Sequence, residues 1–317
     1  MKVFSIGFYN TENFFDCRDN AVIHDADYTP QGSKKWTNNR YADKVNKIGQ
    51  AISRLGWEKT GMPPLFVGLA EIENANVLND LIHSRFLEEF GYQYIHFDSL
   101  DERGMDTAML YRKEFIFPVH VEPMRMVFPE TGSPTDYTRD VLYIQFQFQF
   151  QSFLLNSFVV HLPSRRDFDV NQDFRNLILK KIRHRMDEIL TQDPKAYIIL
   201  MGDMNGNPDD SDAVGILKTR QTRGIRPNEL YNPMWELKKN TGSLTHDGNW
   251  ILFDQMLFSQ AFLQPGGLEF KNAKVFRERF LQDRNPGFQG RPFRTYAGNK
   301  YLGGYSDHFP VYAILNH

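Results

Sequence analysis

Short apolar runs, each closed by glycine, asparagine, proline or a charged residue, recur along the chain. Runs of this length that are rich in β-branched, aliphatic and aromatic residues predict buried strands that end in turns. Pro118 within one of them indicates an edge strand, because proline has no N–H to donate to a neighbouring strand. The runs cover residues 3–9, 65–70, 92–97, 107–111, 115–121, 153–160, 197–201, 250–258 and 309–315, with a shorter one at 273–276.

Residues 144–151 alternate strictly between apolar side chains and glutamines, which is the clearest two-residue period in the sequence. One face of such a strand is buried, and the other is wet or partly covered. Ser152 turns the chain, and the run 153–160 returns as a hairpin partner. This pair is antiparallel, so we expect mixed sheets.

Three longer segments place apolar residues at steps of three and four, which predicts amphipathic helices. They cover residues 38–55, about 74–90, and 171–190. Thr37 or Asn38 caps the first, Gly56 stops it, and Asn74 caps the second. The basic residues on the other side of the third helix are typical of a solvated face. Strands and helices together predict an α/β fold.

Composition narrows the class of protein. The chain has 317 residues, 41% of them hydrophobic, with 27 phenylalanines, which is enough for a large core. No composition break or internal repeat separates two units, so we expect one domain over residues 1–317. The net charge of −2 gives no global field to attract polyanions, although a local cationic groove stays possible. The single cysteine, Cys17, rules out an intrachain disulfide and a cysteine-based zinc site.

The first residues form a strand pattern rather than a signal peptide, since the apolar part is short and no cleavage motif follows it. No run of about 18 apolar residues exists, so no membrane span is expected. These observations favour a cytoplasmic protein, or a secreted or periplasmic one whose signal peptide was removed. No protein partner can be inferred, and we expect a monomer.

Polar side chains able to bind metal or phosphate stand at or near the ends of the predicted strands. The run that ends at Met201 leads into Gly-Asp-Met-Asn-Gly-Asn-Pro at 202–208, where Asp203 and Asn205 are two residues apart and point the same way on an extended backbone. Alone, this pair is equally compatible with a self-capping turn. The full set is Asn10, Glu71, His161, Asp203, Asn205, Asp254, Asp307 and His308.

At these positions the sequence resembles the endonuclease/exonuclease/phosphatase superfamily, which has the DNase I-like fold. The motifs occur in the family's order and span almost the whole chain, which is far more specific than any one of them. Within this superfamily, the sequence resembles a bacterial branch whose substrate is not apparent from the sequence. The matching segments are Tyr-Asn-Thr-Glu-Asn at 9–13, Leu-Ala-Glu-Ile at 69–72, Val-His-Leu at 160–162, Met-Gly-Asp-Met-Asn at 201–205, Phe-Asp-Gln-Met-Leu at 253–257 and Ser-Asp-His-Phe-Pro at 306–310.

The resemblance implies a four-layer sandwich, in which two mixed, mostly antiparallel β-sheets pack face to face with helices on the outer faces. It also implies hydrolysis of a phosphoester assisted by Mg²⁺ or Mn²⁺. Glu71 would be the principal metal ligand, and Asn10 and Asp307 would complete or support the metal site. Mg²⁺ takes oxygen ligands and keeps several waters, so one or two carboxylates suffice.

The resemblance assigns the remaining residues to catalysis. Asp203 would orient or deprotonate the attacking water, and Asn205 would hold a phosphate oxygen. His308, oriented by Asp254, would donate to the phosphate. His161 would hydrogen-bond the phosphate or assist the leaving group.

Three classes of protein are considered for this chain. A phosphodiesterase or nuclease, acting on nucleic acid by endo- or exonucleolytic cleavage, is favoured by His161 and by the arginine-rich segment 271–300. The alternative is a phosphomonoesterase for an inositol-type, lipid or small-molecule phosphate. A non-catalytic binding module is the third class, and the complete set of chemically competent residues argues against it. Arg139 and Arg165, with Arg166 beside it, are candidate phosphate ligands or simply solvated arginines.

Overall fold

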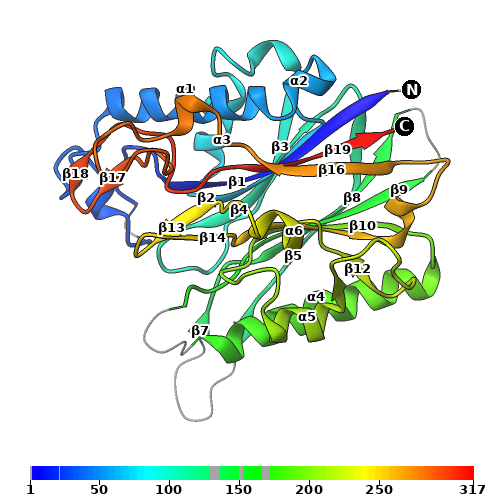
Figure 1. Cartoon of the computed structure of the whole chain (residues 1–317). Coiled ribbons are helices and arrows are strands. Elements are labelled where there is room, and N and C mark those ends of the chain that lie inside the picture. Colours follow the sequence, from blue (N-terminus) through cyan, green and yellow to red (C-terminus); the bar gives the residue numbers. More distant parts are fainter. Residues whose placement is uncertain (1, 21, 129–135, 150–152, 166–170) are drawn as a thin grey trace.

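A computed structural model of the chain describes residues 2–20, 22–128, 136–149, 153–165 and 171–317. Two large sheets pack face to face, with α1, α2 and α3 on the outside of one and α4 and α5 on the outside of the other (Figure 1). This arrangement confirms the predicted α/β sandwich of mixed sheets.

The first sheet has six strands in the order β16-β19-β1-β2-β4-β3. Only β1 and β2 are parallel, and the other pairs are antiparallel. Its strands are β1 Val3–Phe14, β2 Phe66–Ile72, β3 Tyr92–His96, β4 Asp106–Arg112, β16 Glu269–Val275 and β19 Val311–Asn316.

The second sheet has seven strands in the order β11-β12-β15-β10-β9-β8-β5. The pairs β9–β10 and β11–β12 are parallel, and β8 pairs with β9 as the expected antiparallel hairpin. The strand with Pro118 forms the edge of the sheet, as predicted. The strands are β5 Ile116–Met124, β8 Val141–Phe148, β9 Leu154–His161, β10 Tyr197–Asp203, β11 Thr219–Arg220, β12 Leu230–Tyr231 and β15 Asp254–Ser259.

Helices and small hairpins complete the fold. The helices are α1 Asn38–Arg54, α2 Trp57–Thr60, α3 Ala75–Ile82, α4 Gln172–Gln192, α5 Ser211–Leu217 and α6 Met234–Lys238, with 3₁₀ turns at Ala26–Tyr28, Glu88–Phe90, Gln260–Leu263 and Arg279–Leu281. The two-stranded pairs are β6 Val127–Phe128 with β7 Asp136–Tyr137, β13 Leu244–His246 with β14 Asn249–Ile251, and β17 Tyr296–Ala297 with β18 Lys300–Tyr301. None of the helices in the described part of the chain combines the length and apolar character needed to cross a bilayer.

The core between the two sheets is dominated by aromatic and aliphatic side chains. Phe66 of β2 stacks on Phe146 of β8 with ring centroids 5.9 Å apart. Phe146 is buried and Gln145 and Gln147 are only partly covered, as the alternation along β8 predicts. Gly68 lets the sheets approach closely, because a Cβ at this position would lie 2.7 Å from the sulfur of Met201.

Several boundaries differ from the sequence predictions. Strand β1 does not end at Asn10 but continues to Phe14, through a break in its pairing with β2 between these two residues. Helix α3 ends at Ile82, short of the expected residue 90. The run 250–258 is two strands, so that Asp254 begins β15 rather than lying inside a strand.

Candidate functional site

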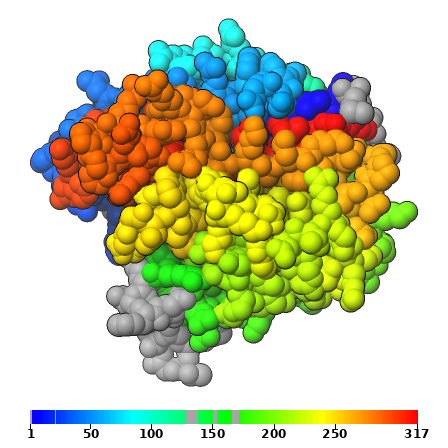
Figure 2. Space-filling model, viewed as in Figure 1, coloured from blue at the N-terminus to red at the C-terminus, as the bar shows by residue number. Residues whose placement is uncertain are grey.

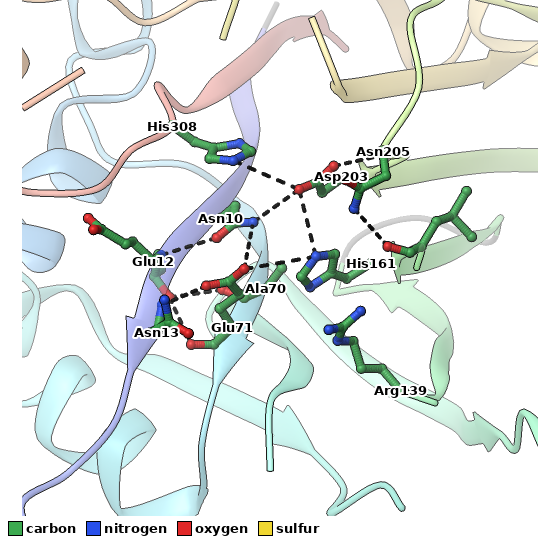
Figure 3. Close-up of polar contacts among 12 residues, drawn as sticks. Asn10, Glu12, Asn13, Ala70, Glu71, Arg139, His161, Asp203, Asn205 and His308 are labelled. Atoms are coloured by element: carbon green, nitrogen blue, oxygen red, sulfur yellow. Dashed lines mark hydrogen bonds and ion pairs between the residues drawn. The ribbon is translucent and has the colours of Figure 1, made fainter. Parts of the chain in front are cut away.

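The candidate site lies where strands of both sheets end (Figure 3). The register of the second sheet places Asp203 beside His161 of β9 on one side and beside Asp254 of β15 on the other. In the first sheet, the parallel register of β1 and β2 pairs Asn10 with Ala70, next to Glu71. These ends meet around a cavity of about 330 Å³, lined by Asn10, Glu71, Arg103, Thr138, Arg139, His161, Pro163, Ser164, Asn171, Phe174, Asp203, Asn205 and His308.

The Glu71 carboxylate is held by an irregular backbone on both strands. Glu71 itself has φ 63°, and Glu12 and Asn13 opposite it have φ 54° and 48°. Residues other than glycine adopt positive φ at a cost, and such strain persists where the surrounding structure imposes it. It aims the Asn13 N–H at Glu71 Oε2, at 2.6 Å, while the Glu12 side chain points away from the cavity (Figure 3).

Asn10 connects the carboxylates of the two sheets. Its side-chain amide donates to Asp203 Oδ2 at 3.1 Å and, at 3.4 Å, to Glu71 Oε1. Asp203 also accepts the Asn205 N–H through Oδ1, at 2.9 Å. Burial raises the pKa of Asp203 to about 6, although the nearby His308 opposes this shift. An acid tuned to this range can accept a proton near neutral pH.

Asp254 and His308 form a buried pair on the other side of Asp203. His308 Nδ1 lies 2.7 Å from Asp254 Oδ2, and His308 Nε2 lies 4.0 Å from Asp203 Oδ2. Burial works against the charged imidazole, but the carboxylates of Asp254, Asp307 and Asp203 outweigh it and raise the pKa of His308 well above its usual value. The ring is therefore an imidazolium at neutral pH, and its Nδ1–H is directed at Asp254.

His161 has the opposite electrostatic character. Its Nε2 lies 3.7 Å from Asp203 Oδ2 and 3.9 Å from Glu71 Oε1. Burial and the Arg139 guanidinium lower the pKa of His161 well below its usual value, so this ring is neutral. Its Nδ1 is buried and has no hydrogen-bond partner within the described residues. The site thus combines one neutral and one charged imidazole.

The residues present fit a hard divalent cation. The closest hydrogen-bond donor to Glu71 Oε1 among the described residues is the Asn10 amide at 3.4 Å, so this oxygen retains capacity for a ligand. The carboxylate oxygens of Glu71 and Asp203 are the ligand type that Mg²⁺ and Mn²⁺ prefer. The Asn10 side chain turns its NH₂ to these carboxylates, because its oxygen accepts the Glu12 N–H at 3.1 Å.

Two of the residues predicted to be in the site lie at its margin. Asp307 does not line the cavity, because its carboxylate turns outward to Arg294 Nη2, at 2.8 Å. Arg165 lines a neighbouring, smaller pocket, where it pairs with Asp210 and donates to the Asn205 carbonyl at 2.8 Å. Arg139, in contrast, is buried at the cavity wall, 3.5 Å from Asp101. Arg166 lies outside the described residues.

Some residues of the site carry no sequence signal of their own. Arg103, Thr138, Ser164, Asn171 and Phe174 line the cavity although they lie in loops or at a helix start. Arg103 lies in the charged loop between β3 and β4. The backbone N–H of Asn13 could not be recognised from the sequence, because its direction depends on the local strain.

Solved structures with the same architecture share little sequence with this chain. A family protein from Bacteroides thetaiotaomicron is 17% identical, with a TM-score of 0.60 over 99% of this chain and 98% of its own. A mannosyl-6-phosphatase from the same species is 16% identical, with a TM-score of 0.61 over 99% and 100%. TDP2 of D. rerio, solved with a single-strand DNA product, is 17% identical, with a TM-score of 0.59 over 99% of each chain. These likenesses show the fold alone.

The sequence comparisons give a more specific result. A search of curated proteins finds no significant match. The model of the Endonuclease/Exonuclease/phosphatase family, however, matches residues 5–317, which is nearly the whole chain. The motif resemblance, the sandwich and this match agree. The chain belongs to the endonuclease/exonuclease/phosphatase family.

Proposed function

We propose that this protein is a Mg²⁺- or Mn²⁺-dependent phosphoric ester hydrolase whose substrate is a phosphodiester. The observation that carries the proposal is that Glu71, Asp203, His161 and His308, from separate parts of the chain, line one cavity. A protein that only bound a ligand would have no need of a carboxylate tuned towards neutral pH beside a charged imidazole.

Glu71 is the residue that would hold the cation, and Asn10, whose amide contacts the Glu71 and Asp203 carboxylates, would support the site. When bound, the cation would neutralise the phosphate charge and stabilise the departing oxygen. The Asn13 N–H fixes the Glu71 carboxylate from behind. We assign Asp307 a supporting role at longer range, since it is paired with Arg294 and its negative charge favours the protonated form of His308.

The remaining side chains would act on the water and the phosphate. Asp203 orients the water and takes its proton as the water attacks phosphorus. His308 donates from Nε2 to a phosphate oxygen, while Asp254 holds Nδ1 and the ring orientation. His161, which is neutral, hydrogen-bonds the phosphate or the leaving oxygen. The Asn205 amide holds a further phosphate oxygen, and Arg139 adds positive charge at the wall.

Two features favour different substrates. The segment 271–300, rich in arginine and aromatic residues, borders the site at Arg294 and favours a diester with groups on both sides of the phosphate. Arg103 and Arg139 at the cavity wall would instead suit the dianion of a phosphomonoester. Among the structural neighbours, one is described with a DNA product and another is a mannosyl-6-phosphatase.

The test is a substrate panel with purified protein. Bis-p-nitrophenyl phosphate, single-stranded and plasmid DNA, mannose 6-phosphate and a phosphoinositide mixture are each incubated with Mg²⁺ or Mn²⁺, with EDTA as control. We expect metal-dependent release from the diester and from DNA. Release from monoesters alone would move the assignment to the monoesterase. Absence of release from every substrate, with Asp203→Asn indistinguishable from the wild type, would overturn the hydrolase assignment.

A further inference from the structure

A second and larger cavity adjoins the candidate site. It has a volume of about 790 Å³ and lies between the β13–β14 hairpin and the segment 283–302. We call it the hairpin cavity. Figure 2 views the face on which the yellow hairpin meets the orange segment. Asp307 forms part of its wall, and the next residue, His308, lines the catalytic cavity. Two consecutive residues therefore line the two cavities.

Charged side chains of both signs line the hairpin cavity in equal number, with Asp247, Asp283 and Asp307 against Arg291, Arg294 and Lys300. Of the three acids, Asp307 is paired with Arg294, Asp283 accepts hydrogen bonds from Asn285, and Asp247 lies 3.3 Å from His246. Arg291 and Lys300 also line the cavity, and neither has an ion-pair partner within the described residues. Their N–H groups can therefore donate to the phosphate of a ligand.

An aromatic ring lies beside these cations. Phe288 is 55% exposed, more than any other phenylalanine in the described ranges. Its ring lines the hairpin cavity. The Arg291 guanidinium lies 5.3 Å from its ring centroid. Exposed aromatic rings next to arginine are the combination that stacks an unpaired base and holds the adjoining phosphate.

We propose that the hairpin cavity binds the nucleotide next to the scissile phosphate, with its base on Phe288 and its phosphate at Arg291 and Lys300. The substrate is then a single nucleic-acid strand, since a base paired in a duplex cannot offer its face to a side chain. This inference rests on the proposed phosphodiesterase function.

The experiment compares a substrate that reaches the hairpin cavity with one that does not. Hydrolysis of a single-stranded DNA hexanucleotide and of bis-p-nitrophenyl phosphate is measured with the wild type, the R291Q/K300Q double variant and Phe288→Ala. Lys195→Gln is the matched control, because Lys195 is an exposed lysine ahead of β10, at the end of that strand remote from Asp203. Circular dichroism confirms that each variant is folded.

We expect the ratio of kcat/KM for the hexanucleotide to kcat/KM for the small diester to fall at least tenfold in both cavity variants, through KM. The slope of log KM against log salt concentration should decrease in magnitude by about one in R291Q/K300Q, because phosphate contacts are lost. Lys195→Gln should leave both quantities as in the wild type. An unchanged ratio, or a parallel loss on both substrates, would overturn the assignment of the cavity.

Failure of the proposed function would look different. If the wild type cleaves neither substrate, the hydrolase assignment fails, and the hairpin cavity is then tested by fluorescence anisotropy with a labelled hexanucleotide. Binding that is at least tenfold weaker in R291Q/K300Q than in Lys195→Gln would retain the cavity as a strand-binding site. Equal binding would reject it.

Discussion

At the scale of single residues, the candidate site holds two imidazoles in opposite protonation states. His308 stands among three carboxylates and keeps its proton, whereas His161 stands near Arg139 and loses it. A charged ring can neutralise a phosphate oxygen, and a neutral one can share a hydrogen bond with the leaving group without adding charge. Asp203 lies between the two rings and is the group best placed to take the proton of water.

This arrangement predicts the effect of two substitutions and a pH profile. Asp203→Asn and His308→Ala should each lower kcat at least about 100-fold, the lower end of what general acid–base help supplies. In the wild type, kcat should fall towards acidic pH, because Asp203 must be ionised and burial raises its pKa to about 6 in the absence of the cation. A bound cation would shift this limb to lower pH.

The measurement is kcat on the best substrate of the panel between pH 4.5 and 9, with thermal unfolding of each variant as the control for folding. Near-wild-type kcat in either folded variant would remove that residue from the mechanism. An acidic limb that persists unchanged in the residual activity of Asp203→Asn would assign it to another group.

At the scale of elements, a buried lysine of α1 holds the strained end of β1. Lys44 is 1% exposed, and its ammonium donates to the backbone carbonyls of Glu12 and Tyr305 at 3.2 and 2.8 Å and to the Thr295 hydroxyl. The Glu12 carboxylate in turn accepts the Thr295 N–H at 2.6 Å. These bonds fix the positive-φ residues that aim the Asn13 N–H at Glu71.

Replacement of Lys44 should therefore weaken metal binding from a distance. We expect Lys44→Met to lower Mn²⁺ affinity about tenfold, the lower end of the effect of losing a group that orients a ligand. Isothermal titration calorimetry measures this directly. Lys47→Met is the matched control, since Lys47 is one turn away on α1 and contacts Gly303 and Asp43 but not β1. Asn13→Gly should retain affinity, because glycine keeps the N–H and tolerates φ 48°. Equal affinities for Lys44→Met and Lys47→Met would exclude the role.

The same elements show what could be predicted from the sequence. Periodicity located the main strands and α1, because burial of one face requires a regular pattern of apolar residues. It also located Asp203 and Glu71 at strand ends. It could not locate the continuation of β1 past Asn10, since the positive-φ residues there are set by contacts with Lys44 and Thr295. The outward turn of Asp307 likewise depends on Arg294, which is distant from any recognised motif.

At the scale of the whole molecule, buried acids in and around the candidate site reduce the stability of the fold at neutral pH. Burial raises the pKa of Glu12 and of Glu73 to about 7 and that of Asp203 to about 6. In the folded chain these groups hold protons that the unfolded chain has already lost above about pH 4.5. Their stabilising contribution is therefore complete below the unfolded pKa and is lost as the pH rises through 6 and 7.

The metal-free protein should accordingly become less stable between pH 6 and 7.5. His308 acts in the same direction, because its raised pKa keeps the folded state protonated while the unfolded histidine titrates near 6.5. His161 has the opposite effect on stability, but only below about pH 6.5. There the unfolded state binds a proton at His161, whereas the folded state does not, because burial lowers the pKa of this ring. We expect a net loss of about 2 kcal/mol in the free energy of unfolding, since each unit of pKa shift corresponds to about 1.4 kcal/mol.

Urea unfolding in EDTA at the two pH values measures this difference, and repetition with saturating Mg²⁺ tests its origin. A cation bound at Glu71 competes with protons on the neighbouring acids, and it binds only the folded state, so it should stabilise the protein more at pH 7.5 than at pH 6 and narrow the gap. Glu73 is buried, accepts the Asp16 N–H at 2.6 Å and does not line the cavity. Glu73→Gln should therefore reduce the pH dependence without changing the Mg²⁺ response. A protein that is equally stable at both pH values without metal would show that the buried carboxyl groups are not protonated as their burial requires.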